Sequence, residues 1–179
     1  VGTPVTIEAV VQGDQSIAPS LVQYGMVLPI GGFGEGLNIF TPSVMKNDDG
    51  SYVMWYSGDD DDGLSYRQRI CRAISPDGIN WTKTGVVMDY GGAYMEYGVI
   101  HPSVMKDDTG LYHMWHTGVG YYGGYRGYIH HATSTDGITW QKMGLEISFG
   151  AAYQPDGVTA PHVYFDGTEW MMWYTGVSW

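Results

Sequence analysis

The fold of this chain is decided by the segment Thr41-Pro42-Ser43-Val44-Met45-Lys46, which returns 60 residues later as His101-Pro102-Ser103-Val104-Met105-Lys106. A looser copy follows as Ala160-Pro161-His162-Val163-Tyr164. Similarity at a fixed period indicates a repeat architecture, in which each copy forms one structural unit. The chain therefore consists of repeated units of about 60 residues.

Two further motifs recur in the same order and with nearly the same period. The first is Trp55-Tyr56-Ser57-Gly58, which returns as Trp115-His116-Thr117-Gly118 and as Trp173-Tyr174-Thr175-Gly176. The second is Ser75-Pro76-Asp77-Gly78-Ile79-Asn80-Trp81, which returns as Ser134-Thr135-Asp136-Gly137-Ile138-Thr139-Trp140. Aromatic-rich segments that are apolar on both faces are typical of sandwiched strands, and Asp-Gly is typical of hairpin turns. Each unit is therefore predicted to form four antiparallel strands.

Four-stranded units packed around an axis predict an all-β protein with a β-propeller fold. A solenoid is the alternative, but its repeats are usually shorter and less aromatic. The motifs divide 1–179, a single propeller segment, into a partial blade over 1–40, blades over 41–98 and 99–157, and a half blade over 158–179. Residues Val5 to Val11 are expected to form the third strand of the partial blade. Because propellers usually need four or more blades, we expect an incomplete arc.

Two explanations of the incomplete arc stay open. In one, a homodimer closes the ring, with two chains sharing the half blades and giving six blades. In the other, the chain is a piece of a longer protein. The sequence begins at Val1 without an initiator methionine, so either a leader was removed, which favours a secreted or periplasmic protein, or the start was cut.

Charge narrows the classes of partner. The chain has 8 Lys and Arg against 19 Asp and Glu, a formal net charge of -11. Nucleic acids and anionic membrane surfaces would repel it, and no apolar run is long enough to span a bilayer. Neutral ligands such as glycans remain.

Cys71 is the single cysteine, which excludes an internal disulfide and predicts a buried, inert thiol.

The repeated motifs resemble those of the five-bladed β-propeller glycosidases, especially glycoside hydrolase family 43 and its fructosidase and mannoside phosphorylase relatives. The resemblance covers the chain from about Leu37 onward. It implies a carbohydrate-active protein with its site in a central funnel, an inverting mechanism if the protein is a hydrolase, and a calcium ion on the propeller axis. The Ser-x-Asp-Gly-x-x-Trp turns also resemble the sialidase Asp-box, which implies that Asp77, Trp81, Asp136 and Trp140 only brace hairpins.

The sequence departs from family 43 where the catalytic carboxylates should stand. In that family a carboxylate precedes a first-strand proline, and a glutamate stands two places before the corresponding proline of another blade. Here the first positions hold Thr41, His101 and Ala160, and the second hold Phe40, Ile100 and Thr159. None is acidic. The three-carboxylate set of the family therefore has no counterpart at these positions.

Acids do occur in the variable loops that lead to each first strand, namely Glu35, Glu96 and Asp156. Glycoside hydrolysis needs one protonated and one ionised carboxylate, so we predict Glu96 and Asp156 as the acid/base pair and Glu35 as a helper. The other interpretation is that these acids are solvated or bonded within turns. A non-catalytic, sugar-binding or self-assembling propeller that lost its carboxylates is the alternative function.

The predicted ligand-binding residues are aromatic and imidazole groups on the same face. Tyrosine rings can stack on sugars or pack against another chain, and histidines can line the funnel or lie satisfied in the core. His116 takes the place of Tyr56 and Tyr174 in the repeat. The acidic run 59–62 has two interpretations, a calcium site or a solvated loop. The spacing of known calcium loops is absent, which favours the solvated loop. The predicted set is Tyr121, Tyr122, Tyr125, Arg126, His101, His116, His162, Tyr56 and Tyr174.

Overall fold

The computed structural model of the chain describes residues 7–12, 21–61, 66–95, 97–122, 124–150 and 156–178, and every regular element within them is a β-strand. The strands are β1 (Ile7–Gln12), β2 (Leu21–Leu28), β3 (Asn38–Lys46), β4 (Tyr52–Asp61), β5 (Tyr66–Ser75), β6 (Thr82–Met88), β7 (Gly98–Lys106), β8 (Tyr112–Tyr121), β9 (Tyr125–Ser134), β10 (Gln141–Ile147), β11 (Gly157–Phe165) and β12 (Trp170–Val177). No helix in these ranges could cross a membrane.

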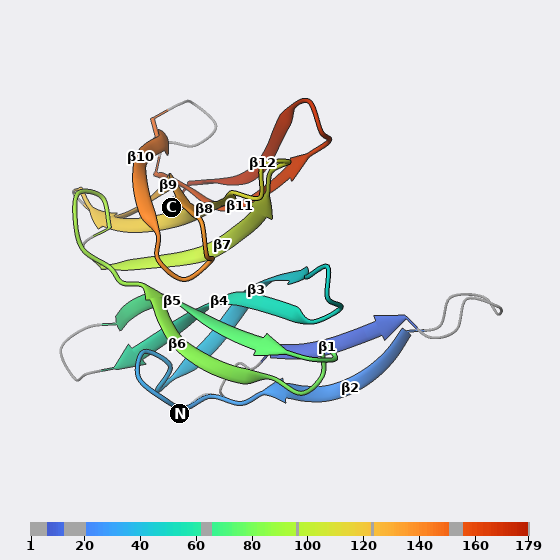
Figure 1. Cartoon of the computed structure of the whole chain (residues 1–179). Helices are drawn as coiled ribbons and strands as arrows, with labels where there is room; N and C mark the ends of the chain where they lie inside the picture. Colours follow the sequence, from blue (N-terminus) through green and yellow to red (C-terminus); the bar gives the residue numbers. More distant parts are fainter. Residues whose placement is uncertain are drawn as a thin grey trace.

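The strands form antiparallel blades in chain order, as the repeats predict (Figure 1). One blade is β3-β4-β5-β6 and the next is β7-β8-β9-β10, and a single parallel pair, Gln68 with Gly98, joins them. β1 and β2 form a separate pair, and so do β11 and β12. A glycine with positive φ lies in β2, β6 and β10 alike, at Gly25, Gly85 and Gly144, so β1 and β2 match the third and fourth strands of a blade.

The chain is therefore an all-β propeller segment whose sheets do not close into a ring. Completion of the ring by a second copy or by further residues stays a prediction.

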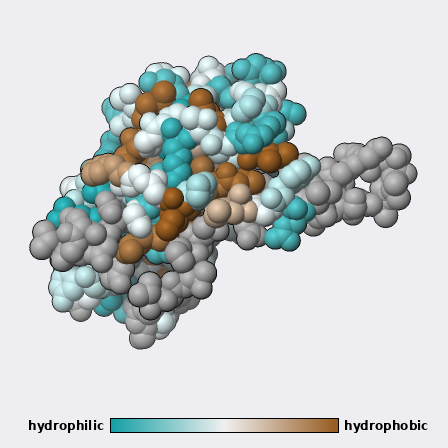
Figure 2. All heavy atoms as spheres, turned by 90° about the horizontal axis from the view of Figure 1, so that it is seen from below, coloured by the Kyte–Doolittle hydropathy of each residue, from teal (hydrophilic) through white to brown (hydrophobic). Residues whose placement is uncertain are grey.

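Apolar clusters lie between successive blades and hold them face to face. Between the two four-stranded blades, Trp55 and Ile70 pack against Val99 and Met114, and all four are fully buried. A second cluster joins β2 to the first blade through Leu28 and other buried residues, and a third joins the second blade to β11. Apolar side chains also remain at the surface, and Figure 2 shows a brown band of them across one face.

The two Asp-Gly turns are braced as the sequence predicts. Asp77 Oδ1 accepts the N–H groups of Ile79 and Asn80 at 2.8 and 2.7 Å, and Asp136 repeats the pattern. These backbone N–H groups lower the pKa of the Asp136 carboxyl to about 2. The Asp-box interpretation of the two aspartates is confirmed.

The two turn tryptophans differ from each other. Trp81 Nε1 donates to Gly78 O of its own turn at 2.9 Å. In the turn of the second blade, Gly137 O accepts instead from Trp55 Nε1 of the first blade, at 2.9 Å. Trp140 Nε1 has no partner among the described residues. The expectation that Trp140 braces its turn as Trp81 does is therefore wrong in this detail. The second turn is tied across the blade interface.

The inner strand of each repeat, namely β3, β7 or β11, bends at the residue before its proline. Thr41, His101 and Ala160 have φ angles of 49°, 55° and 51°, a left-handed region that residues other than glycine seldom adopt. The strand pairing shifts register at the same points, which marks a β-bulge that leaves one residue out of the ladder. The bulged residue therefore needs a hydrogen-bond partner outside its own blade.

A hydroxyl of the preceding blade supplies that partner. His101 N–H donates to Ser57 Oγ at 2.9 Å, and Ala160 N–H donates to Thr117 Oγ1 at 3.1 Å. Farther along the same strands, Val104 N–H donates to Ser43 Oγ and Val163 N–H to Ser103 Oγ, both at 3.0 Å. Because Ser57 and Thr117 occupy the same repeat position, as do Ser43 and Ser103, every inner-strand interface in the described residues carries the same pair of bonds.

We expect Thr117→Val to destabilise the protein by about 1–3 kcal/mol, because the Ala160 N–H loses the acceptor that the buried Thr117 hydroxyl provides while the side-chain shape is kept. Thr82→Val is the matched control, since Thr82 is an exposed strand residue and should change stability by less than about 0.5 kcal/mol. Urea unfolding followed by tryptophan fluorescence measures both. Equal stability of the two variants would contradict the role given to this hydroxyl.

Candidate functional site

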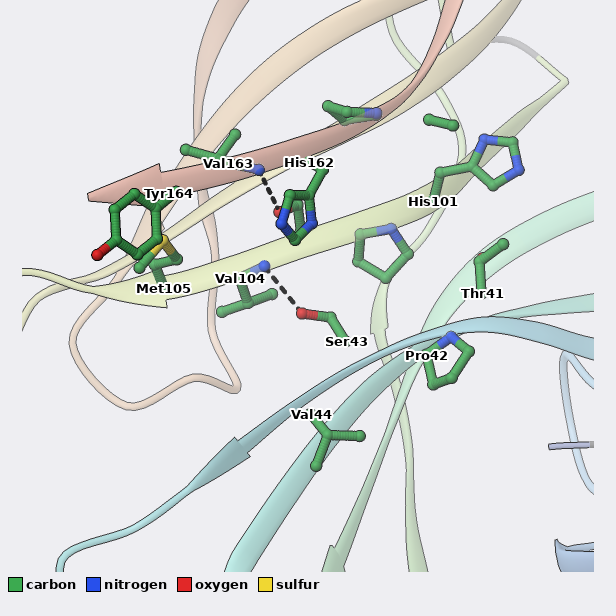
Figure 3. Close-up of a pocket in the computed structure, with 14 residues that line it drawn as sticks. Thr41, Pro42, Ser43, Val44, His101, Val104, Met105, His162, Val163 and Tyr164 are labelled. Atoms are coloured by element: carbon green, nitrogen blue, oxygen red, sulfur yellow. Dashed lines mark hydrogen bonds between the residues drawn. The ribbon is translucent and has the colours of Figure 1, made fainter. Parts of the chain in front are cut away.

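The inner strands of the three repeats line a pocket of about 470 Å³ on the propeller axis (Figure 3). Its walls come from residues 41–44, 101–105 and 160–164, the segments that decide the fold. Thr41 and His101 lie at one end of the pocket, Met105 and Tyr164 lie at the other, and His162 lies between them. Both of the histidines predicted to lie near the axis, His101 and His162, line this pocket.

His101 is tied to both neighbouring blades, to the preceding one by its backbone N–H and to the following one by its side chain. Its Nδ1 lies 2.9 Å from Thr159 Oγ1 and 3.4 Å from Thr117 Oγ1. Burial lowers the pKa of the imidazole below its ordinary value, so the ring is neutral at neutral pH. A neutral imidazole offers one donor and one acceptor nitrogen, which suits hydrogen bonding to a ligand hydroxyl.

The residues that line this pocket do not fit a calcium ion. Calcium takes six to eight oxygen ligands, usually with carboxylates among them, whereas the pocket walls contain imidazole, hydroxyl, proline and apolar groups. Across the described ranges, no group of three His, Cys, Asp or Glu side chains is placed to hold a metal ion. In the acidic run, Asp59 is buried and accepts from Asn38 Nδ2 at 3.2 Å, and Asp62 lies outside those ranges.

Exposed tyrosines gather in the loop between β8 and β9. Tyr121, Tyr122 and Tyr125 are exposed by 62%, 71% and 59%, although each has an aromatic neighbour. Tyr97, which comes from the segment leading into β7, packs edge-on against Tyr125 with ring centroids 5.1 Å apart. Sequence reasoning missed Tyr97, because its column holds Leu37 in the preceding repeat. The loop therefore presents a set of aromatic rings to solvent.

An ion pair lies beside this aromatic loop. Arg126 Nη2 is 3.4 Å from Asp156 Oδ1, and both side chains are about one-fifth exposed. The pair joins β9 to the start of β11, which approach closely because both strands carry glycine there. A Cβ on Gly127 would lie only 2.5 Å from Val158 O. The structure thus brings together five predicted residues, namely Asp156, Arg126, Tyr121, Tyr122 and Tyr125.

Glu35 and Tyr56 lie together inside the first blade instead. Glu35 is 2% exposed, accepts the Tyr56 hydroxyl at 2.5 Å and forms an ion pair with Lys83. Burial, together with the adjacent Glu35, raises the pKa of Tyr56. Cys71, directly opposite Tyr56 on β5, is buried as expected, and burial raises the pKa of its thiol. Glu35, Tyr56 and Cys71 do not line the axial pocket.

The remaining predicted residues are dispersed. His116 is fully buried and lines a different pocket, with His130 and Lys142, so the expectation that it lines the axial cavity is corrected. Tyr174 packs against the cluster of Trp115 and Val158. Glu96 lies outside the described residues, so its distance from Asp156 is not defined.

The predicted acids occupy different repeat positions. The N–H groups of Leu37, Tyr97 and Asp156 each donate to β4, β8 or β12 in the same way, so Asp156 is the counterpart of Leu37 and Tyr97. The loop position of Glu35 is filled by Met95 in the next repeat, because both residues make the same pair of glycine contacts.

Comparison with known proteins supports the fold. No protein-family model matches the chain. Two uncharacterised proteins of Mycobacterium tuberculosis, from strains CDC 1551 and H37Rv, are 31% identical to it over 138 residues, which cover 72% of this chain and 44% of each relative. The chain thus spans less than half the length of these curated relatives.

Among solved structures, a glycoside hydrolase aligns with 93% of the chain at a TM-score of 0.72 and 18% identity, and the match covers 52% of that protein. A β-1,2-mannobiose phosphorylase from Listeria innocua aligns with 89% at a TM-score of 0.67 and 14% identity, covering 42% of that protein. A structure from a study of GH130 mannoside phosphorylases and hydrolases is 27% identical over 64% of the chain and 33% of its own length, with a TM-score of 0.50. The chain therefore has the propeller fold of glycosidases and mannoside phosphorylases.

We expect stability to fall as the pH drops from about 6.5 toward 3. Burial, with His130 nearby, lowers the pKa of His116 to about 3 from an ordinary 6.5, so over this range the unfolded chain binds more protons than the folded chain. The other groups around His116 are His131 and Lys142. His116→Tyr, which restores the residue found at Tyr56, should lose less stability between about pH 7 and pH 5 than the parent.

Urea unfolding at each pH measures this difference. His162→Tyr is the control, because it makes the same substitution at an exposed histidine. Parallel pH profiles for the parent and His116→Tyr would show that His116 is not the group responsible.

Proposed function

We propose that this chain is part of a carbohydrate-active protein, a glycosidase-like propeller that acts on a neutral glycan at the loop containing Tyr121, Tyr122 and Tyr125. The observation that carries the proposal is the set of solvent-facing tyrosine rings beside the Arg126–Asp156 ion pair. The fold, which the chain has in common with glycoside hydrolases and mannoside phosphorylases, supports the same substrate class.

The chemistry of these side chains suits a sugar. Tyrosine rings present apolar faces that match the C–H faces of pyranose rings, and their hydroxyls hydrogen-bond to ligand oxygens. Arg126 donates through a guanidinium and Asp156 accepts through a carboxylate, so together they can bind vicinal hydroxyl groups. The chain has a formal net charge of -11, which favours a neutral glycan over an anionic one.

For catalysis we assign Asp156 and Glu96 as the two carboxylates of an acid/base pair, with inversion at the anomeric carbon. Asp156 lies partly buried at the start of β11, 3.4 Å from Arg126, and is assigned the base, and Glu96 is assigned the acid. Glu35 no longer fits as a helper, because Lys83 and Tyr56 enclose its carboxylate inside the blade. We propose β-1,2-linked mannosides as the first substrates to test, since two similar structures are named for them.

A non-catalytic sugar-binding protein is the second candidate. It is favoured because the positions before the inner-strand prolines hold Thr41, His101 and Ala160, and because the carboxylate of Asp156 already faces Arg126. In that case the aromatic loop binds the glycan and no bond is broken. The two candidates differ in turnover and agree in binding.

Tyr125→Ala should weaken binding of β-1,2-mannobiose about three- to tenfold, because it removes an exposed ring that is braced by Tyr97. Tyr24→Ala is the matched control, since Tyr24 is similarly exposed on β2 in another part of the chain. Isothermal titration calorimetry measures the affinity of each variant. A loss of affinity that is the same for both variants would remove the loop from the binding site.

Glu96→Gln and Asp156→Asn should each lower turnover of the glycan at least about 100-fold while leaving its affinity within about threefold. Glu169→Gln, which changes an exposed acid in the turn before β12, should leave both quantities unchanged. Release of reducing sugar or sugar phosphate is followed by chromatography. Binding with no turnover in the parent protein would favour the second candidate, and full turnover in either acid variant would remove that acid from the mechanism.

A further inference from the structure

The two complete blades contain the same interior site, filled differently. In the first blade, a lysine on the outer strand, Lys83, donates to Pro29 O and Gly31 O at 2.6 and 2.8 Å and also contacts the Glu35 carboxylate. In the second blade, Lys142 donates to Asp89 O and Gly91 O at 3.4 and 3.2 Å in the same arrangement. Both lysines pair with the equivalent alanine of the third strand.

The loop that closes this site is also repeated. Gly31 N–H donates to Glu35 O and Glu35 N–H to Gly32 O, and residues 91, 92 and 95 make the same two bonds. Met95 therefore stands where the first blade has Glu35. The carboxylate that Lys83 contacts in the first blade is missing from the second, where a thioether takes its position in the sequence.

The groups that would face this carboxylate have changed as well. Opposite each other in the first blade are Tyr56 and Cys71, and their counterparts in the second are His116 and His130. The two imidazoles are stacked with ring centroids 5.6 Å apart. Neither nitrogen of His116 nor Nε2 of His130 has a hydrogen-bond partner among the described residues, and His116 is fully buried. Buried polar nitrogens without partners are costly and rare, which points to a ligand.

Space for such a ligand is present in the second blade. Met95, His116, His130, Lys142 and Leu145 line a pocket of about 210 Å³. Tyr94, which also lines it, has a φ of 66° where the first blade uses Gly34 with a φ of 82°. A tyrosine held in a left-handed conformation is strained, and strain of this kind is concentrated at ligand sites.

We propose that the pocket between Met95, His116 and Lys142 binds the carboxylate of a small organic acid, at the place that Glu35 fills with its own carboxylate in the first blade. Lys142 donates to the anion through Nζ, and a ring N–H of His116 or His130 donates the second hydrogen bond. The short apolar part of the acid lies against Met95 and Leu145. This site is separate from the aromatic loop and does not depend on the glycan function.

Charge argues for an anion rather than a metal ion. Two imidazoles and a thioether are ligands that soft metals accept, but the Lys142 ammonium on the pocket wall repels a cation. Burial and the charge of Lys142 also lower the pKa of His130, so the imidazoles are neutral and one N–H of each is available as a donor.

The test uses the whole chain, labelled with 15N-histidine, in titrations with sodium acetate at constant ionic strength and neutral pH. We expect a saturable change in the ring resonances of His116 and His130 and a raised pKa of His116, because an adjacent anion favours the imidazolium. Lys142→Met should weaken acetate binding at least about tenfold. Lys106→Met is the control. It also removes a lysine charge, but at the C-terminal end of β7, and should leave the acetate affinity within about twofold.

Met95→Glu is a second, independent arm that restores the solution used in the first blade. The new carboxylate should occupy the pocket, so that the imidazole resonances already resemble the acetate-bound state and added acetate has no effect. Three results would overturn the proposal: a response that does not saturate, equal acetate affinity of Lys142→Met and Lys106→Met, or stoichiometric binding of zinc or copper with no response to acetate.

Discussion

The hydroxyl that each blade offers to the next is the interaction on which the rest of this structure depends. The proline of every inner strand follows a residue in a left-handed conformation, and the resulting bulge removes one N–H from the ladder of its own blade. Ser57 and Thr117 accept these N–H groups across the interface. A buried N–H without an acceptor costs about 1–3 kcal/mol, so the hydroxyl both stabilises the blade and fixes its distance from its neighbour.

This constraint explains why the scaffold is so regular while its contents differ. Serine or threonine must stand at the same place in each repeat, and tryptophan fills the space behind it at Trp55 and Trp115. Side chains that do not take part in the interface are free to change. The first blade holds a Glu35–Lys83–Tyr56 cluster, and the second holds Met95, Lys142 and two histidines around a pocket. One backbone geometry therefore presents two chemistries.

The two proposed sites lie in different parts of the second repeat and use different physics. The aromatic loop is exposed and is joined to the next strand by the Arg126–Asp156 ion pair, which suits a large neutral ligand bound through ring faces and hydroxyls. The pocket at His116 is small and has the Lys142 ammonium on its wall, which suits an anion. The fold accounts for neither site, because function depends on the side chains that a scaffold carries.

The sequence by itself determined the blades, because three motifs with one period specify strands, turns and inner-strand prolines that any packing must respect. It also indicated the tyrosines of 121–125 with Arg126, since a loop that differs between repeats is where a scaffold varies. Only the tertiary structure decided which side chains each acid lies against. Glu35 and Asp156 read alike in the sequence, yet one is enclosed by Lys83 and the other faces Arg126. Burial and pairing depend on contacts between residues about 30 to 50 positions apart, and the loop sequences contain no periodic signal that encodes such contacts.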